Sequence, residues 1–246
     1  RLAEPLRQAV IGSLNRAARN RRPRHNEIDW PRTIRANLKH YQPDYKTIVP
    51  ETRIGYGRKR SALRDIILCV DQSGSMATSV VYSGVFGAAL ASLPSVRTKM
   101  VVYDTSVVDL TAELSDPVDL LFGVQLGGGN DTSRALEYCQ GLVRQPHDTI
   151  LVLISDLFEG EGTERMLKRV ASLVGAGVQF IALLALNDDG APSYDHNVAA
   201  AFAGFGIPSF ACTPDLFPEL MAAAINRQDI TQWAAAREIV TSRGYK

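Results

Sequence analysis

Long hydrophobic runs are missing from this sequence. The longest apolar stretches, residues 66–70 and 180–186, fall well below the ~18–20 residues that a membrane-spanning helix needs. No membrane span is therefore expected. The chain begins at Arg1 without the apolar core of a signal peptide, so either the natural start is missing or the chain is a fragment of a longer protein.

Cysteine and histidine are also scarce. The three cysteines, Cys69, Cys139 and Cys212, are odd in number, widely spaced and set in apolar stretches, which is typical of reduced thiols in a cytoplasmic protein. The four histidines are dispersed, and no two have the spacing of metal ligands. Neither a disulfide framework nor a zinc site is expected. Repeats and low-complexity segments are absent as well, as in an ordinary globular protein.

Charge is nearly balanced overall but unevenly distributed. The net charge is +1, whereas residues 1–64 carry 16 Lys and Arg against 5 Asp and Glu, and the remaining residues carry 11 against 21. A basic segment joined to an acidic domain either packs on that domain, stays solvated, or binds an anionic partner. The arginines at 16–24, with Trp30 and Tyr41 nearby, make nucleic-acid binding the alternative function of this chain.

The basic segment, residues 1–64, is predicted to be partly helical and partly extended. Residues 2–18 have apolar side chains at the spacing of an amphipathic helix. Residues 16–24 are expected to form a basic linker that is broken at Pro23. Residues 41–60 contain two prolines and two glycines and are predicted to be irregular, with a short strand at 47–49.

A short helix is predicted between these parts. Asp29, Trp30 and Pro31 indicate its start, because an acid at the N-cap and a proline in the first turn favour helix initiation. The helix is expected to run to Leu38. Trp30 is interpreted as an anchor that packs on the following domain.

From residue 65 onward, short apolar runs alternate with helical patterns. Continuous Ile, Leu and Val runs predict strands that are buried on both faces, as in a parallel sheet between helices. The predicted fold class is α/β, a doubly wound, mostly parallel sheet flanked by helices, with one antiparallel hairpin. The domain is expected to span residues 65–227, followed by a C-terminal helical segment at 228–246. The predicted strands are 66–70, 99–103, 107–110, 150–154, 179–186 and 209–212, and the predicted helices are 80–93, 132–144, 163–174, 197–203, 217–225 and 233–240.

Oxygen-bearing side chains follow the first predicted strand at every second position. Asp71, Ser73 and Ser75 place a carboxylate and two hydroxyls on a tight loop, to which Gly74 gives conformational freedom. Ligands of α/β sheets collect at the carboxyl ends of strands, and Mg²⁺ prefers such oxygens. For this string alone the alternative is structural: the serines cap the next helix and Asp71 makes turn hydrogen bonds.

Two further loops end in oxygen donors at the same expected edge. Ser155 and Asp156 follow the strand at 150–154, and a glycine-rich turn at 127–132 opens the helix that contains Ala135. Three separate loops with the same chemistry are much less probable by chance than one. The sequence therefore favours a metal site over capping alone.

Together these residues resemble the metal-ion-dependent adhesion site of von Willebrand factor A (VWA) domains. The resemblance covers about residues 65–225 and implies a Rossmann-like VWA fold that binds Mg²⁺, with Mn²⁺ or Ca²⁺ as alternatives. It implies that Asp71, Ser73 and Ser75 form the centre of the site and that Asp156 acts through a water. The remaining coordination position would receive an Asp or Glu carboxylate from a protein partner.

One position departs from the pattern of this family. The family usually has Gly-Gly-Thr-Asp before the helix, and its Thr supplies a metal oxygen. Counting back from Ala135 puts Asn130 in the place of that Thr, and an amide oxygen can also bind a hard cation. Thr132 is the alternative ligand if the turn is remodelled.

The segment before the domain resembles bacterial CoxE-like VWA proteins. This resemblance rests on residues 28–38, the basic extended stretch after them, and then the metal loop. It implies an adaptor that works with a MoxR-type AAA+ ATPase in assembly, metal insertion or remodelling, and not an enzyme. A metal-dependent phosphatase is disfavoured, because Ser73 stands where a second Asp is needed and no Lys partner or general base is evident.

Overall fold

The structure of this chain is a computed structural model that describes residues 14–20, 23, 25, 28–58, 64–76, 87, 90–91, 96–115, 129–159, 162–184, 193–213 and 216–239. The chain divides into two compact units. Gln8–Ser61 form one, which we call the N-terminal unit. Arg1–Arg7 together with Ala62–Lys246 form the other, which we call the α/β unit.

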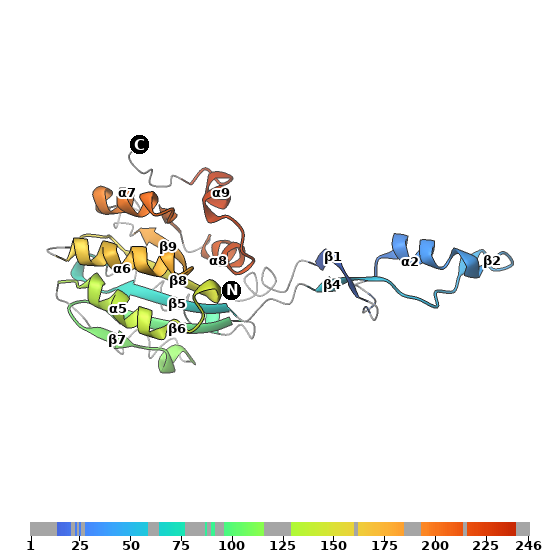
Figure 1. Cartoon of the computed structure of the whole chain (residues 1–246), viewed down its shortest axis with the longest axis horizontal. Helices are drawn as coiled ribbons and strands as arrows, with labels where there is room; N and C mark the ends of the chain where they lie inside the picture. The colour runs from blue at the N-terminus through green and yellow to red at the C-terminus, as the bar shows by residue number, and fades with distance from the viewer. Residues whose placement is uncertain are drawn as a thin grey trace. The chain divides into compact units, whose positions relative to one another are not determined.

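The α/β unit is built on a six-stranded sheet with the strand order β10-β9-β8-β5-β6-β7 (Figure 1). Neighbouring strands run parallel, except that β7 pairs antiparallel with β6. The predicted fold class and all six predicted strands of this unit are confirmed, within a few residues at their ends. The strands are β5 (Arg64–Asp71), β6 (Val96–Tyr103), β7 (Val107–Asp109), β8 (Thr149–Ser155), β9 (Gln179–Leu184) and β10 (Ser209–Ala211).

Burial of both faces explains why the sequence pattern identified the central strands. Every residue of β5 and of β8 is buried. Because successive side chains of a strand point to opposite faces, Ile67 and Cys69 belong to one core, whereas Leu68 on the other face lies beside Gly87. A strand with no solvated face needs no polar alternation, so its sequence is a continuous apolar run.

Helices surround this sheet. Figure 1 shows α5 and α6 lying across it, and both contribute with α7 to the core that contains Ile67. Of the predicted helix 80–93, the described residues Gly87, Leu90 and Ala91 are helical. The helices of the second half are α5 (Thr132–Leu142), α6 (Thr163–Gly175), α7 (His196–Gly204), α8 (Phe217–Ile225) and α9 (Ile230–Ala235).

The C-terminal helix is displaced from its predicted position. It was expected at 233–240, but α9 begins at Ile230 and ends at Ala235. The start is fixed by Asp229, whose side chain accepts hydrogen bonds from the amides of Thr231 and Gln232 at 2.8 and 3.1 Å. An N-cap of this kind sets where a helix begins more firmly than apolar spacing does.

In the N-terminal unit, the predicted helix at 2–18 is wrong where it can be compared. β1 (Leu14–Asn20) pairs antiparallel with β4 (Gly55–Arg58), with a register shift between Asn15 and Arg19. Residues 2–13 lie outside the described part of the chain. The strand partner lies far along the sequence, so local periodicity carried no sign of it.

The predicted helix at Trp30 is confirmed as α2 (Trp30–Ala36). Its N-cap, Asp29, accepts a hydrogen bond from the amide of Arg32 at 3.2 Å, and Pro31 lies in the first turn. The 3₁₀ helix η2 (Leu38–His40) and a hairpin of β2 (Tyr41–Gln42) with β3 (Thr47–Ile48) follow.

Polar side chains fasten α2 to the chain that follows it. Asn37 is 1% exposed, and its Nδ2 donates to the carbonyls of Thr33 and Thr52 at 2.7 and 2.8 Å. Its Oδ1 accepts from the amides of Glu51 and Thr52 at 3.0 and 3.1 Å. We call this arrangement the Asn37 clasp.

Apolar side chains of α2 and η2 remain exposed. Trp30 is 45% exposed, Ile34 44% and Leu38 58%. The Trp30 ring contacts His25 edge-on, with 6.0 Å between ring centroids. Trp30 is therefore only partly buried within the N-terminal unit, and its packing on the following domain stays a prediction.

Other sequence predictions concern single residues. All three cysteines are free, with Cys69 and Cys139 buried. Met76 is 1% exposed and belongs to the core. In the part of the chain that the structure describes, no helix is long and apolar enough to cross a membrane.

Candidate metal site

Asp71, the last residue of β5, lies fully buried at the carboxyl edge of the sheet. The strand register places it opposite Tyr103, which ends β6. Its Oδ1 accepts a hydrogen bond from the amide of Ser73 at 2.9 Å, and its Oδ2 accepts one from the hydroxyl of Ser155 at 2.9 Å. No Lys or Arg among the described residues pairs with this carboxylate, so neutral groups alone stabilise its charge.

A second buried carboxylate, Asp156, follows directly after β8. It is 4% exposed, and its Oδ1 accepts a hydrogen bond from the amide of Phe158 at 3.1 Å. Burial raises the pKa of Asp71, and the charge of Asp156 raises it further, against the lowering effect of hydrogen bonds from Ser73 and Ser155. A divalent cation would reduce the cost of ionising Asp71, because it compensates both negative charges.

The loop after β5 folds back on the sheet edge. The amide of Gln72 donates to the carbonyl of Tyr103 at 2.7 Å, and the amide of Met76 donates to the carbonyl of Ser73 at 2.9 Å. The 3₁₀ turn η3 (Gly74–Met76) results. The side chain of Ser75 lies outside what the structure describes, so its role as a ligand stays a prediction.

The structure brings Asn130 to Asp71 from across the sheet edge. Its Nδ2 lies 3.4 Å from Oδ2 of Asp71 and 2.6 Å from the carbonyl oxygen of Phe158. Both neighbours are acceptors, so the amide nitrogen, and not the amide oxygen, must face them.

Thr132 has other partners at this edge. It is the first residue of α5 and is 1% exposed. Its hydroxyl lies 3.0 Å from the hydroxyl of Tyr103, which is itself fully buried. Within the described residues, Asn130 makes a direct contact with the Asp71 carboxylate, whereas Thr132 contacts Tyr103 and Glu159.

Glu159 also belongs to this edge. Both of its carboxylate oxygens lie 3.1 Å from the amide nitrogen of Thr132. Burial raises the pKa of Glu159, against the lowering effect of its hydrogen bonds to the start of α5. The sequence feature that agrees with this position of Glu159 is Gly162, because a Cβ there would lie 2.6 Å from Oε1 of Glu159.

Two other acids, Asp104 and Asp109, also accept hydrogen bonds. Asp104 is only 7% exposed and accepts a hydrogen bond from the amide of Ser106 at 2.6 Å. Asp109 accepts from the amide of Thr111 and from the hydroxyl of Tyr138, both at 2.9 Å. These hydrogen bonds fix the hairpin between β6 and β7. Glu161 lies outside the described residues.

The donor set at this edge fits a hard divalent cation. It consists of carboxylate, hydroxyl and amide oxygens, which are the ligands that Mg²⁺ prefers. Among the residues that the structure describes, no three or more His, Cys, Asp or Glu side chains gather as a metal cluster. A metal held by the described residues alone would therefore need neutral oxygens beside its acids.

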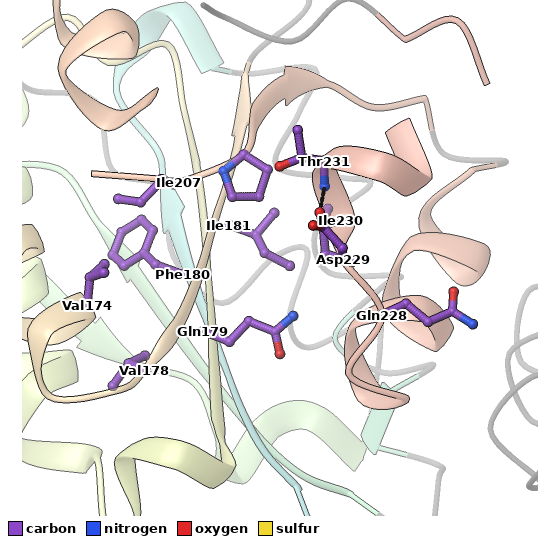
Figure 2. A pocket seen from close by; sticks show the side chains of 12 residues that line it. Val174, Val178, Gln179, Phe180, Ile181, Ile207, Gln228, Asp229, Ile230 and Thr231 are labelled. Atoms are coloured by element: carbon purple, nitrogen blue, oxygen red, sulfur yellow. Dashed lines mark hydrogen bonds between the residues drawn. The ribbon is translucent and has the colours of Figure 1, made fainter. Parts of the chain in front are cut away.

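A separate pocket of about 320 Å³ lies at the amino end of β9, where Gln179 begins the strand (Figure 2). Its described lining is mixed, with apolar side chains such as Phe180 and Ile207 beside polar ones such as Gln179 and Gln228. Asp229 is the one charged residue in that described lining, and it caps α9. Asp71 lies at the carboxyl end of its strand, so this pocket is not part of the candidate metal site.

A mostly parallel α/β sheet, with a buried aspartate after its central strand and oxygen donors from two further loops, defines a VWA-type domain. The family described as "VWA domain containing CoxE-like protein" matches residues 2–221, and the chain belongs to this family. VWA domains are typically non-catalytic modules that bind other proteins.

A curated relative is the uncharacterized protein YehP of Escherichia coli strain K12, which is 40% identical over 216 residues. The match covers 87% of this chain and 57% of YehP, so the chain spans little more than half the length of that relative.

Solved VWA-type structures are similar at lower identity. The pilus adhesin SpaC from Lactobacillus rhamnosus GG, in an open conformation, is 14% identical with a TM-score of 0.49, covering 66% of this chain and 30% of SpaC. A von Willebrand factor type A protein from Catenulispora acidiphila is 12% identical with a TM-score of 0.46, and the match covers 70% of this chain and 43% of that protein. The manganese-loaded TRAP protein of Plasmodium vivax is 17% identical with a TM-score of 0.46, and the match covers 58% of this chain and 63% of TRAP.

Proposed function

We propose that this chain is a metal-dependent protein-binding module. Asp71, Ser73 and Ser75 would hold Mg²⁺, with Mn²⁺ or Ca²⁺ as alternatives, and Asp156 would act through a water. Asn130, or Thr132 in its place, would supply a further oxygen. The observation that carries the proposal is the fully buried Asp71 carboxylate beside Asp156, hydrogen-bonded only to neutral groups among the described residues.

The cation would supply positive charge at an open coordination position, where an Asp or Glu of a partner protein binds. The residues of the chain have positioning roles. Ser155 orients the Asp71 carboxylate through its hydroxyl, and the amide of Phe158 orients Asp156. This arrangement binds a ligand without making or breaking a covalent bond.

Calorimetric titration of the full chain with MgCl₂ at neutral pH tests the metal site. One saturable site is expected, and Asp71→Ala should abolish it. Asp44→Ala is the matched control, because Asp44 is an exposed acid of the N-terminal unit. Equal Mg²⁺ binding by Asp71→Ala and the unmodified chain would contradict the proposal.

We further propose that the protein partner is a MoxR-type AAA+ ATPase and that the complex forms in the cytoplasm. The family membership supports this partner class, and the three free cysteines suit a reducing compartment. An ATPase encoded beside this gene, purified and immobilised, should retain the chain in Mg²⁺ and release it in EDTA. Retention of Asp71→Ala to the same extent would argue against a bridge through the metal.

Binding rather than catalysis is the proposed activity, so the Mg²⁺-loaded chain should not hydrolyse generic phosphoesters. Measurable turnover that Asp71→Ala removes would contradict this. The described residues and the relatives contain nothing that favours the nucleic-acid alternative.

A further inference from the structure

The loop after Asp156 folds back over the start of α5. Leu157 has φ of 61°, a left-handed conformation that reverses the chain, and its side chain is 1% exposed. The hydroxyl of Thr163 donates to the carbonyl of Glu159 at 3.1 Å. The carbonyl of Phe158 and the carboxylate of Glu159 consequently both face the residues that open α5.

Glu159 is fastened to the helix itself. Its two oxygens share the amide of Thr132 at 3.1 Å, and this amide, at the first position of an α-helix, has no partner within the helix. Gly162 leaves the space that the carboxylate occupies, since a Cβ there would come within 2.6 Å of it. The backbone of Gly162, with φ of −83° and ψ of −10°, is one that alanine adopts without strain.

Phe158 fixes the orientation of Asn130. Its carbonyl accepts from Nδ2 of Asn130 at 2.6 Å, and the same NH₂ group is directed at Oδ2 of Asp71. An amide coordinates a cation through its oxygen, because its NH₂ group only donates hydrogen bonds. Turning the amide so that its oxygen meets a cation on Asp71 would direct that oxygen at the Phe158 carbonyl and break the 2.6 Å hydrogen bond.

On the basis of the proposed metal site, we infer that Phe158 and Glu159 form a latch on it. The latch holds Asn130 as a hydrogen-bond donor to Asp71, and uptake of the cation requires the Phe158 carbonyl to withdraw so that Asn130 turns. Glu159 is a positioning residue, since it keeps the loop on α5 and has no part in the proposed coordination.

Two variants release the latch in different ways. Glu159→Ala removes the carboxylate, whereas Gly162→Ala keeps its charge and displaces it sterically from the amide of Thr132. Glu164→Ala is the matched control, because Glu164 is an exposed acid in the first turn of α6 and pairs with Lys168 at 2.7 Å. If Glu159→Ala fails to fold, Gly162→Ala decides the question.

Calorimetric titration with MgCl₂ should give dissociation constants about 3- to 10-fold lower for Glu159→Ala and Gly162→Ala than for the unmodified chain, because a closed form that cannot bind weakens apparent affinity. Glu164→Ala should bind equally or slightly more weakly. Loss of a nearby negative charge alone weakens cation binding, so tighter binding by Glu159→Ala separates release of the latch from simple electrostatics.

Hydrogen exchange gives a second readout without metal. The amide of Thr132 should exchange faster in both latch variants than in the unmodified chain, and Mg²⁺ should produce the same increase in the unmodified chain. If that chain binds Mg²⁺ through Asp71 but both variants bind equally or more weakly, the latch is wrong and the metal site stands. If Asp71→Ala still binds Mg²⁺ normally, the metal site is wrong and the latch with it.

Discussion

At the scale of single residues, Asp71 is a carboxylate placed where ionisation is unfavourable. It is fully buried beside Asp156, and burial is the main reason that its pKa is raised. A raised carboxyl pKa in the folded state destabilises the fold above that pKa, and the penalty disappears as pH falls toward the unfolded value of ~3.9. Asp71 therefore destabilises the metal-free protein most at neutral pH, where its carboxyl group is ionised.

We expect Asp71→Asn to stabilise the metal-free protein at pH 7 by about 1 kcal/mol, or ~2–4 °C in Tm. The Ser155 hydroxyl can reverse its hydrogen bond to suit the amide of the variant. Thermal melts in EDTA between pH 4 and 7 measure this, and the advantage of Asp71→Asn should shrink as pH falls. An advantage that grows toward pH 4 would have the wrong sign for a raised pKa.

Arg64, at the start of β5, is a second unfavourable charge. It is 2% exposed, and within the described part of the chain its Nε and Nη1 have no hydrogen-bond partner, while its Nη2 donates to Gln179. Burial lowers the pKa of this guanidinium. Buried donors without partners carry a desolvation penalty that a hydrophobic side chain of similar size does not.

Arg64→Met should therefore raise the free energy of unfolding by about 1 kcal/mol in urea titrations. Arg97→Met is the comparison, because Arg97 pairs with Asp65 at 2.6 Å and its removal leaves that buried acid unpaired. Arg97→Met should destabilise the protein. An equal loss in the free energy of unfolding in both variants would show that the donors of Arg64 are as well paired as those of Arg97.

At the scale of elements, strands that are determined by burial were predictable from the sequence. A strand that is determined by pairing with a distant segment was not. β5 and β8 were predictable because both of their faces are apolar. β1 was mistaken for helix, because its pairing with β4 is set by residues far along the chain and its register is irregular. Local spacing does not contain that information.

The same distinction applies to the candidate site. Asp71 and Asp156 were predictable as acids at strand ends, where parallel strands bring their carboxyl termini together. The contact of Asn130 with Phe158 was not, because it uses a backbone carbonyl, and every residue has one. Glu159 was missed because its place depends on the left-handed turn at Leu157, which has no glycine to signal it.

The Asn37 clasp makes a prediction for the elements of the N-terminal unit. Asn37→Ala removes four hydrogen bonds and leaves the amides of Glu51 and Thr52 without their acceptor. A local loss of about 2–3 kcal/mol is expected. Gln42→Ala, at an exposed position of β2, is the control.

Hydrogen exchange measures this loss region by region. The segment around Thr52 should lose protection in Asn37→Ala, while β5 and β8 keep theirs, because the two units are separately compact. A matching loss of protection in β5 would show that the units unfold together.

At the scale of the whole molecule, a ligand that binds only the α/β unit should stabilise only that unit. At 100 times its dissociation constant, Mg²⁺ should add about 2.7 kcal/mol by mass action, or roughly 5–10 °C in Tm for a domain of this size. Calorimetric scans with Mg²⁺ and with EDTA measure the difference, and Asp71→Asn should show none. A shift that persists in Asp71→Asn would place the cation elsewhere.

The position of Asp71 on β5 also has a mechanical consequence. β5 lies inside the sheet, hydrogen-bonded in parallel to β6 on one side and to β8 on the other. A partner that pulls on Asp71 along the strand must shear both ladders at once, since their hydrogen bonds lie across the direction of force and share the load. An edge strand such as β7 or β10 has one neighbour, so the same pull would be resisted by one ladder only. The candidate site is thus anchored to a strand well placed to resist traction.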